Sequence, residues 1–313
     1  MIFPQNKTRN RNYEGRFYVM EFKDYIGRSI GPQKIEYNWR DMALYALAVG
    51  AHAEDLLYTY ENGMKALPSF GVVPYWNAVN NYPQRPVPYP ASSILKEALE
   101  RESGKALAML HFGHELIMHK PIDPLKGSLI FEDTITNVYD RGEGKGILVA
   151  TDFPVYDEAG NMVCENKSST VFFTGGGFGG EAPPKSTISI PDGPPDYVVE
   201  DYISKTQNAL YRLTGDTNHV HISPEAAKKV GFDRTFMQGL CSFGFACRMG
   251  IQAIIPGEPE RMTRMAVQMR NVCYPDSQIK FIGWNVGEGK VVFQLVNAAD
   301  NQPILDKCEF EYI

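Results

Sequence analysis

The amino-acid sequence predicts an α+β protein of two similar halves, each wrapping an antiparallel sheet around one apolar helix. Three observations lead to this prediction. Runs of β-branched and aromatic residues, separated by Gly, Asp and Pro, recur in both halves of the chain. A helical pattern precedes the strands of each half. The tetrapeptide Gly-Glu-Gly-Lys occurs at 142–145 and again at 287–290, each time between two predicted strands, which indicates an internal duplication.

The first half follows a polar, basic stretch that we interpret as a flexible tail, residues 1–24. Residues 37–53 have helical spacing, and Asn38 is placed to cap that helix. The segment 62–90 is rich in Pro, Tyr and Asn, so we expect an irregular crossing there. Strands are predicted at 111–122, 127–140, 146–157 and 162–174. The first half is therefore expected to span 25–180, and residues 181–196 are expected to form a linker.

The second half, residues 197–313, repeats this order. Ser223 is expected to cap a helix that begins with Pro224, where the missing N–H of proline costs no hydrogen bond. The segment 237–255 is apolar on nearly all sides, which predicts a buried helix. Further strands are predicted at 265–274, 278–286, 290–298 and 303–313.

Composition and charge exclude several classes of protein. Of the 313 residues 43% are hydrophobic, too many for a disordered chain, and no window reaches the ~18 consecutive apolar residues that a membrane span requires. The net charge of −6 gives no general attraction to nucleic acid or anionic lipid. Five scattered cysteines indicate free thiols in a reducing compartment. The final residues 311–313 are not an S-K-L type signal, so we expect a cytoplasmic protein, with a peroxisomal one as the alternative.

A glycine-rich run at 175–180, Gly-Gly-Gly-Phe-Gly-Gly, satisfies the pattern G-x-G-x-x-G. A dinucleotide site needs a helix that opens at the last glycine, because the helix N-terminus holds the pyrophosphate. Pro183 and Pro184 stand where that helix would be. We therefore interpret the run as a linker and expect no NAD.

A histidine cluster in the first half could suggest a metal site. His111, His114, Glu115 and His119 lie within nine residues. Strand alternation places His111 and Glu115 on one face and His114 on the other. Since zinc needs three or four converging ligands, we expect no metal.

Asp216, Asn218 and His221 form the strongest candidate site. They lie within six residues of one another, in a turn just before Ser223. A carboxylate beside an imidazole can hold a water, take its proton and deliver another. Gly239 begins the apolar helix, where backbone N–H groups at the positive helix end suit a developing oxyanion. The alternative is that Asp216 and Asn218 only shape the turn and His221 packs beneath it.

These motifs resemble a known family. Leu-Thr-Gly-Asp-Thr-Asn at 213–218, His-Ile-Ser-Pro at 221–224 and Gly-Leu-Cys-Ser-Phe-Gly at 239–244 resemble the hydratase 2 signature of the MaoC-like dehydratases. In the first half, Leu-Pro-Ser-Phe-Gly-Val at 67–72 and the glycines of 176–180 resemble the hydratase 2 unit of the type 2 peroxisomal multifunctional enzymes. The resemblance extends over roughly 37–313 and implies a double hot-dog fold.

The resemblance also implies roles for individual residues. Asp216 and His221 would activate water, the Gly239 N–H would bind the thioester oxygen, and Asn218 would order the pocket. Substrate contacts are implied for His111, Phe112, Arg141, Thr217 and Met269. Arg141 replaces a family lysine, and both residue types can meet a CoA phosphate. The chain departs from the family at His219, where proline is usual, at Gln238, where histidine is usual, and at Met269, where an aromatic residue is usual.

The implied activity is the reversible hydration of trans-2-enoyl-CoA to (3R)-3-hydroxyacyl-CoA, with medium, long or bulky acyl chains. It requires no metal or redox cofactor, and acyl-CoA is the expected partner of a homodimer. One alternative is a hot-dog thioesterase, which attacks C1 rather than C3. The other is a non-catalytic acyl-CoA-binding protein, in which His219 and Gln238 have disabled the chemistry.

The first half has no counterpart of the Asp216, Asn218, His221 motif. We therefore expect the second half to carry the chemistry and the first to shape the acyl tunnel. The irregular aromatic segment would replace the usual helix, and Tyr75 and Trp76 would influence the chain-length preference.

Overall fold

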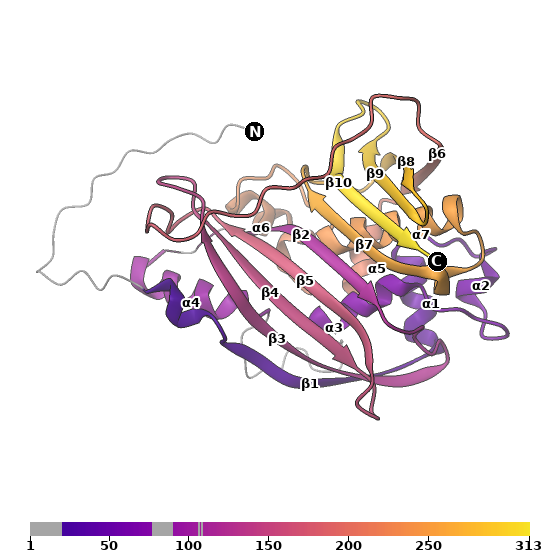
Figure 1. Cartoon of the computed structure of the whole chain (residues 1–313), viewed down its shortest axis with the longest axis horizontal. Coiled ribbons are helices and arrows are strands. Elements are labelled where there is room, and N and C mark those ends of the chain that lie inside the picture. The colour runs from indigo at the N-terminus through magenta and orange to yellow at the C-terminus, as the bar shows by residue number, and fades with distance from the viewer. Residues whose placement is uncertain (1–20, 77–89, 106, 108) are drawn as a thin grey trace, which may run out of the picture.

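The computed structural model describes residues 21–76, 90–105, 107 and 109–313. Within them, ten strands form one antiparallel sheet with the order β1-β3-β4-β5-β2-β7-β10-β9-β8-β6 (Figure 1). The strands of the first half are β1 (Ser29–Asn38), β2 (Met109–Met118), β3 (Lys126–Asp140), β4 (Ile147–Tyr156) and β5 (Met162–Phe172). Those of the second half are β6 (Tyr197–Ile203), β7 (Met262–Met269), β8 (Ser277–Gly287), β9 (Lys290–Asn297) and β10 (Pro303–Tyr312).

The strand order confirms the internal duplication. The first half has the order β1-β3-β4-β5-β2, and the second half has the matching order β6-β8-β9-β10-β7. The two Gly-Glu-Gly-Lys segments lie in matching positions, one between β3 and β4 and the other between β8 and β9. The halves meet edge to edge, because β2 pairs with β7. The fold is the predicted α+β double hot-dog.

The helices that cover the sheet are short, with one exception. The α-helices are α1 (Trp39–Ala48), α2 (Leu56–Thr59), α3 (Val73–Trp76), α4 (Ser92–Ser103), α5 (Gln207–Arg212), α6 (Pro224–Lys229) and α7 (Gly239–Ile254). The 3-10 helices are η1 (Phe22–Tyr25), η2 (Pro68–Val72), η4 (His219–His221) and η5 (Pro259–Arg261). In Figure 1, α1, α5 and α7 lie behind the sheet. Among the described residues, no helix is both long and apolar enough to cross a membrane.

The predicted helix caps are present. The Asn38 side chain accepts a hydrogen bond from the N–H of Arg40, and Asp41 accepts one from the N–H of Asn38, which completes a capping box. Ser223 accepts one from the N–H of Ala226 at the start of α6. These side chains satisfy N–H groups that have no partner within the helix.

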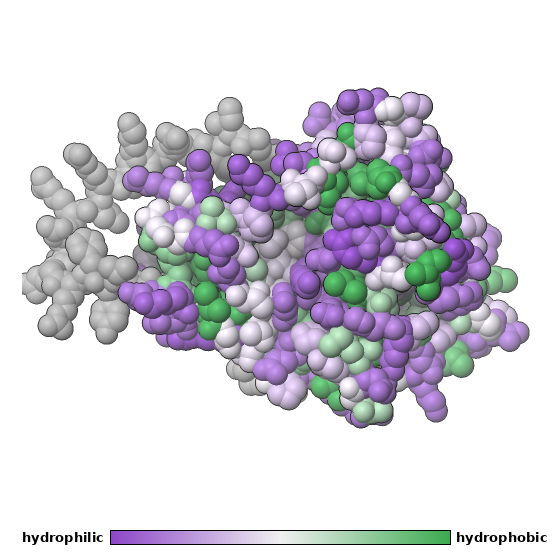
Figure 2. All heavy atoms as spheres, viewed as in Figure 1, coloured by the Kyte–Doolittle hydropathy of each residue, from purple (hydrophilic) through white to green (hydrophobic). Residues whose placement is uncertain are grey.

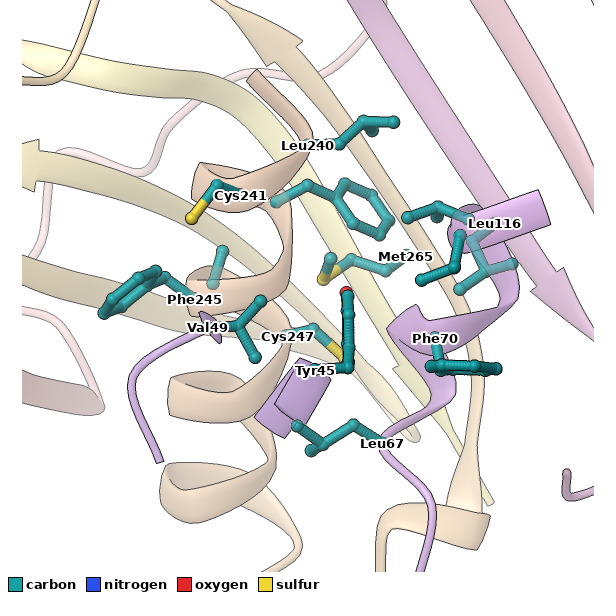
Figure 3. Close-up of a cluster of buried hydrophobic side chains, with 14 of the residues drawn as sticks. Tyr45, Val49, Leu67, Phe70, Leu116, Leu240, Cys241, Phe245, Cys247 and Met265 are labelled. Atoms are coloured by element: carbon teal, nitrogen blue, oxygen red, sulfur yellow. The ribbon is translucent and has the colours of Figure 1, made fainter. Parts of the chain in front are cut away.

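Helix α7 forms the centre of the core, as its apolar sequence predicted. Its residues from Leu240 to Ile251 are all buried. Figure 3 shows Leu240, Cys241, Phe245 and Cys247 of α7 in one buried cluster with side chains of the first half, including Tyr45 of α1 and Phe70 of η2. The Tyr45 hydroxyl donates a hydrogen bond to the carbonyl of Ser69 at 2.9 Å. One core is therefore shared by both halves, which couples the position of α7 to the first half.

The first half has the predicted helix in α1, whose Met42, Tyr45, Ala46 and Ala48 are buried. It also has shorter elements: η2 packs against β2, β5 and α7, and α3 packs against η2 and β3. Pro68 at the first position of η2 starts a tight turn, and Phe70 is 2% exposed. Residues 77–89 and the side chains of Tyr75 and Trp76 lie outside the described residues, so the tunnel prediction that rests on them stays a prediction.

Some predicted boundaries and elements differ from the structure. Phe22 lies within the predicted tail 1–24, yet it is buried and its ring centroid lies 4.5 Å from that of Phe178. Residues 181–196 contain no helix or strand. The edge strands β1 and β6 were not predicted, because a half-exposed edge strand lacks the continuous apolar signal of a central one. The helix α4 was not predicted either; its sequence is largely polar and only Ser92, Leu95 and Leu99 are buried.

The outer face of the sheet carries mainly hydrophilic side chains (Figure 2). Arg264 of β7 donates to Glu115 of β2 and, at 2.8 and 2.9 Å, to Glu309 and Glu311 of β10. The contact with Glu115 ties the two halves together on the side opposite the helices, and the contacts with Glu309 and Glu311 hold Arg264 within the second half.

Asp133 of β3 should make the stability of the protein depend on pH. Its side chain is fully buried, accepts the N–H of Ala91, and burial raises its pKa to about 7 from an ordinary value of 3.8. The unfolded chain ionises Asp133 near pH 4, whereas the folded chain resists ionisation, so stability is lost as the pH rises from about 4 to 7. Asp133→Asn should lack this loss. The difference in the free energy of unfolding between Asp133→Asn and wild type should therefore change in favour of the variant by up to roughly 4 kcal/mol between pH 4 and pH 8.

Urea denaturation at several pH values measures this difference. Asp233→Asn is the matched control, because Asp233 is exposed. A constant difference between Asp133→Asn and wild type across the pH range would contradict the prediction.

Candidate active site

A cavity of about 330 Å³ lies at one end of the β2–β7 pair, between the two halves. Its lining includes eight of the predicted residues: Asp216, Asn218, His221, Gly239, His111, Phe112, Arg141 and Met269. Thr217 does not line it; its carbonyl accepts a hydrogen bond from Arg212, and its side chain is half-buried. Neighbouring residues in a tight turn point in different directions, which separates Thr217 from Asp216 and Asn218.

Asp216 lies in the turn between α5 and η4 and is 2% exposed. Its Oδ1 accepts a hydrogen bond from the N–H of Asn218 at 3.1 Å. Burial raises the pKa of Asp216, and the nearby His221 opposes this rise. The site therefore favours a protonated carboxyl more than water does.

His221 ends η4 and faces the same cavity. Its Nδ1 lies 3.0 Å from the carbonyl oxygen of Phe236. Because a carbonyl can only accept, this contact assigns the proton of the neutral ring to Nδ1 and leaves a lone pair on Nε2. Burial lowers the pKa of His221, while Asp216 opposes the decrease. Buried together, the two groups form a potential acid and a potential base.

Asn218 also shapes the turn. Its side chain accepts a hydrogen bond from the N–H of Val220 at 3.3 Å and caps η4. Asp216 and Asn218 therefore do shape this turn, as the alternative interpretation of the sequence expected. Both residues nevertheless line the cavity, so the turn that they stabilise also forms the site.

Gly239 begins α7 and lines the same cavity, beside Met269 and His111. A Cβ atom at this position would lie 2.6 Å from the sulfur of Met269 and 3.8 Å from the Cβ of His111. A side chain at this position would have to displace the end of the Met269 side chain. The first N–H groups of a helix have no intrahelical acceptor and carry the positive end of its dipole.

Gln238 connects α7 to the catalytic candidate His221. It is fully buried, and its Nε2 donates to the carbonyl of Asn208 at 3.0 Å. The Asn208 side chain in turn donates to the carbonyl of His221. The sequence analysis identified Gln238 as a departure but missed Asn208, because nothing in the sequence pairs residues thirty positions apart.

A β-bulge in β2 changes the predicted arrangement of the histidines. His111 pairs with Thr170 and Gly113 with Ser169, so Phe112 is the extra residue. As a result His111 and His114 lie on the same face, with ring centroids 5.4 Å apart. The predicted alternation, with His111 and Glu115 on one face, is therefore wrong, because a bulge shifts the alternation by one residue.

The residues of this cluster have separate partners. His114 contacts Asn166 at 3.0 Å, and His119 contacts Glu165 at 2.6 Å. Glu115 binds Arg264 on the outer face. In the described ranges, no group of three or more His, Cys, Asp and Glu side chains is placed to hold a metal ion.

Two arginines border the cavity, one from each half. Arg141 follows β3, and Arg270 follows Met269 at the end of β7. The sequence analysis missed Arg270. The available signal was its position: Arg270 is a cationic residue directly after Met269, a predicted substrate contact at the end of a strand.

Comparisons with known proteins agree with this geometry. Residues 35–175 match the model of the MFE-2 hydratase 2 N-terminal domain, and residues 186–306 match that of the MaoC-like domain. A crystal structure of a MaoC-like dehydratase from Phytophthora capsici is 30% identical, with a TM-score of 0.77, over 94% of this chain and 98% of that chain. The protein belongs to the MaoC-like dehydratases.

Two curated relatives of this MaoC-like dehydratase differ in length. Peroxisomal multifunctional enzyme type 2 of Mus musculus is 31% identical over 86% of this chain, which spans 35% of that enzyme. A probable enoyl-CoA hydratase 2 of Dictyostelium discoideum is 29% identical over 92% of this chain and 95% of the relative. The chain thus matches about a third of one relative and nearly all of the other.

The contact between Gly239 and Met269 can be tested directly. In Gly239→Ala the new methyl group should displace the Met269 side chain into the cavity and lower kcat/KM by ~10-fold, which corresponds to about 1.4 kcal/mol. Gly239→Ala with Met269→Ala should recover most of the loss, because the obstructing sulfur is gone. Steady-state kinetics of wild type, Gly239→Ala, Met269→Ala and the double variant give the coupling energy. Equal losses in Gly239→Ala and in the double variant would contradict this explanation.

Proposed function

We propose that this protein catalyses the reversible hydration of trans-2-enoyl-CoA to (3R)-3-hydroxyacyl-CoA. The observation that carries the proposal is the buried pair Asp216 and His221, which lines one cavity together with Gly239 at the N-terminus of α7. Membership of the MaoC-like dehydratases and similarity to a probable enoyl-CoA hydratase 2 support the same reaction.

The proposed chemistry starts from uncharged side chains. Burial favours protonated Asp216 and neutral His221, and the Phe236 carbonyl holds the proton of that neutral ring on Nδ1. Water attacks C3 while its proton passes to Nε2 of His221. The C2 atom receives the proton of Asp216. The product leaves a carboxylate beside an imidazolium, and burial favours return of the proton to the carboxylate through the next water.

The helix α7 supplies the third component. As water adds to C3, charge develops on the thioester oxygen. The N–H of Gly239 donates to that oxygen at the positive end of α7. The close approach of Met269 and His111 keeps this part of the cavity compact. The acid, the base and the N–H donor thus act on different atoms of one substrate.

We further propose that the second half carries the chemistry and the first half shapes the acyl site. The opposite end of the β2–β7 pair has a second cavity, of about 440 Å³, beside Met118 and Met262. The ionisable residues bordering it include Lys65, which pairs with Glu260 at 2.8 Å.

In the active cavity the apolar lining, with Phe112 and Phe236 among its residues, suits a medium, long or bulky acyl chain.

We also propose that the reaction needs no metal or redox cofactor, that the protein works in a reducing compartment, and that it forms a homodimer. Hydration changes no oxidation state, and the site offers an acid, a base and an N–H donor, which supports a reaction without metal or redox cofactor. The five cysteines are free and buried, which supports a reducing compartment such as the cytoplasm. Exposed Val198 and Tyr202 on the edge strand β6 support a homodimer.

The first test is turnover of crotonyl-CoA and of a longer enoyl-CoA, followed by loss of enoyl absorbance. The product should be oxidised by a 3R-specific dehydrogenase and not by a 3S-specific one. Release of free thiol would instead identify a thioesterase, and tight binding without turnover would identify a non-catalytic binding protein.

The second test concerns the acid–base pair. Asp216→Asn and His221→Ala should each lower kcat by at least ~10²-fold. In wild type, kcat should fall at low pH as His221 gains a proton and at high pH as Asp216 loses one; Asp216→Asn should lack the alkaline decrease. Asp216→Asn should not lower the melting temperature, because it removes a buried ionisable group. Near-normal turnover in either variant would contradict the assignment of that residue.

A further inference from the structure

The glycine-rich run 175–180 surrounds a carboxylate at the end of β3. Oδ1 of Asp140 accepts the N–H of Gly142 at 2.8 Å and that of Gly177 at 2.7 Å, and Oδ2 accepts the N–H of Gly179 at 2.7 Å. These backbone donors hold the pKa of Asp140 below its ordinary value. Such a concave group of N–H donors binds anions, and here the protein's own side chain fills it.

The glycines are required for this contact. A Cβ atom at Gly176 would lie 2.4 Å from the carbonyl oxygen of Gly142 and 2.5 Å from that of Gly146. Gly177 and Gly179 have φ angles of +90° and +80°, which residues with a side chain rarely adopt. The run therefore lies directly against the turn between β3 and β4.

Two further contacts hold the run and the residue that follows it, Glu181, against the first half. The Phe178 ring packs on the buried Phe22 with centroids 4.5 Å apart. The N–H of Asp140 donates to the carbonyl of Glu181 at 2.7 Å. The segment is consequently part of the packed first half rather than a free connection.

The braced turn carries Arg141, which lines the active cavity. The N–H of Arg141 donates to the carbonyl of Gly146 at 3.2 Å, and its guanidinium donates to the carbonyl of Lys145 at 2.8 Å. Both acceptors belong to the turn that the glycine run covers. The placement of the guanidinium therefore depends on the conformation of this turn.

The duplication supplies an internal comparison. Alignment of the two Gly-Glu-Gly-Lys segments places Asn285 at the position of Asp140 and Val286 at that of Arg141. Val286 is 46% exposed and does not line the active cavity. The second turn has contacts of its own, since the N–H of Asn285 donates to Asp196 at 2.7 Å and the N–H of Tyr312 donates to the carbonyl of Gly289 at 2.9 Å. Of these two turns, only the first carries an arginine that lines the active cavity.

We propose that Asp140 and residues 175–180 form a clamp that positions the Arg141 guanidinium to bind a phosphate of the CoA substrate. This inference rests on the proposed function. Asp140 does not itself touch substrate; it is a positioning residue that acts through Arg141. An arginine fork held in one orientation loses less rotamer entropy when it binds phosphate.

The test compares Asp140→Ala, Asp140→Asn, Arg141→Ala and the double variant Asp140→Ala with Arg141→Ala. Crotonyl-CoA and crotonyl-pantetheine serve as substrates, since pantetheine lacks the phosphates. Asp140→Ala should raise KM for crotonyl-CoA at least ~5-fold with kcat within ~2-fold, and should leave KM for crotonyl-pantetheine nearly unchanged. Asp140→Asn should have a smaller effect, because it keeps one acceptor. The double variant should be no worse than Arg141→Ala.

Asp157→Asn is the matched control. Asp157 directly follows β4 of the first half and accepts an N–H within its turn, from Asn161, but it does not line the active cavity. It should leave KM for both thioesters unchanged. An unchanged KM for crotonyl-CoA in Asp140→Ala, an equal rise for crotonyl-pantetheine, or additive effects with Arg141→Ala would overturn the clamp. If Asp140→Ala does not fold, the same comparison is made with Asp140→Asn.

Titration calorimetry with free CoA separates this proposal from the proposed function. Wild type that binds CoA but does not hydrate crotonyl-CoA would overturn the proposed function, and the clamp would then be judged by Kd. In that case Asp140→Ala should weaken CoA binding at least ~5-fold, and an unchanged Kd would overturn the clamp.

Discussion

The pairing of β2 with β7 is the contact on which the active cavity depends. It joins the two halves into one sheet in a register that places His114 opposite Val267 and Gly113 opposite Gln268. This register brings the start of β2 beside the end of β7, so the cavity has walls from both halves. Unpaired, these strands would each expose a row of backbone groups. The edge-to-edge junction therefore satisfies both sheets and forms the site in the same place.

Burial then determines what the site can do. Asp216 and His221 are ordinary turn residues in the sequence, but the core around α7 excludes water from both. Desolvation favours the neutral carboxyl and the neutral imidazole, and the Phe236 carbonyl assigns the proton of the neutral ring to Nδ1. An acid and a base of this kind cannot coexist in water at neutral pH, where the carboxyl would ionise. The chemistry is thus a property of the packing as much as of the residues.

The two halves share a topology and differ where function differs. Each has the same strand order, yet the second half contains the long buried helix α7, while the described part of the first half has the shorter elements α1, η2, α3 and α4 before β2. The glycine run braces the Gly-Glu-Gly-Lys turn of the first half, next to the active cavity. Duplication supplied two similar scaffolds, which now differ in their turns and helices.

The sequence by itself determined the strands with strong apolar patterns, the caps at Asn38 and Ser223, the buried helix α7 and the internal duplication. These features depend on local periodicity and on side chains that bond to nearby backbone, so they can be read from short windows. The signature from Asp216 to Gly239 identified residues that share one cavity for a similar reason, since the motif is nearly continuous in the chain.

Only the tertiary structure decided the bulge at Phe112, the place of Thr217 away from the cavity, and the contact of Asp140 with Gly177 and Gly179. A bulge arises from the register of two strands, and the direction of a turn side chain arises from the packing around it. The glycine run shows the difference most clearly. Its composition predicts a linker. In the folded first half it instead packs against a turn that lies about thirty residues earlier in the chain.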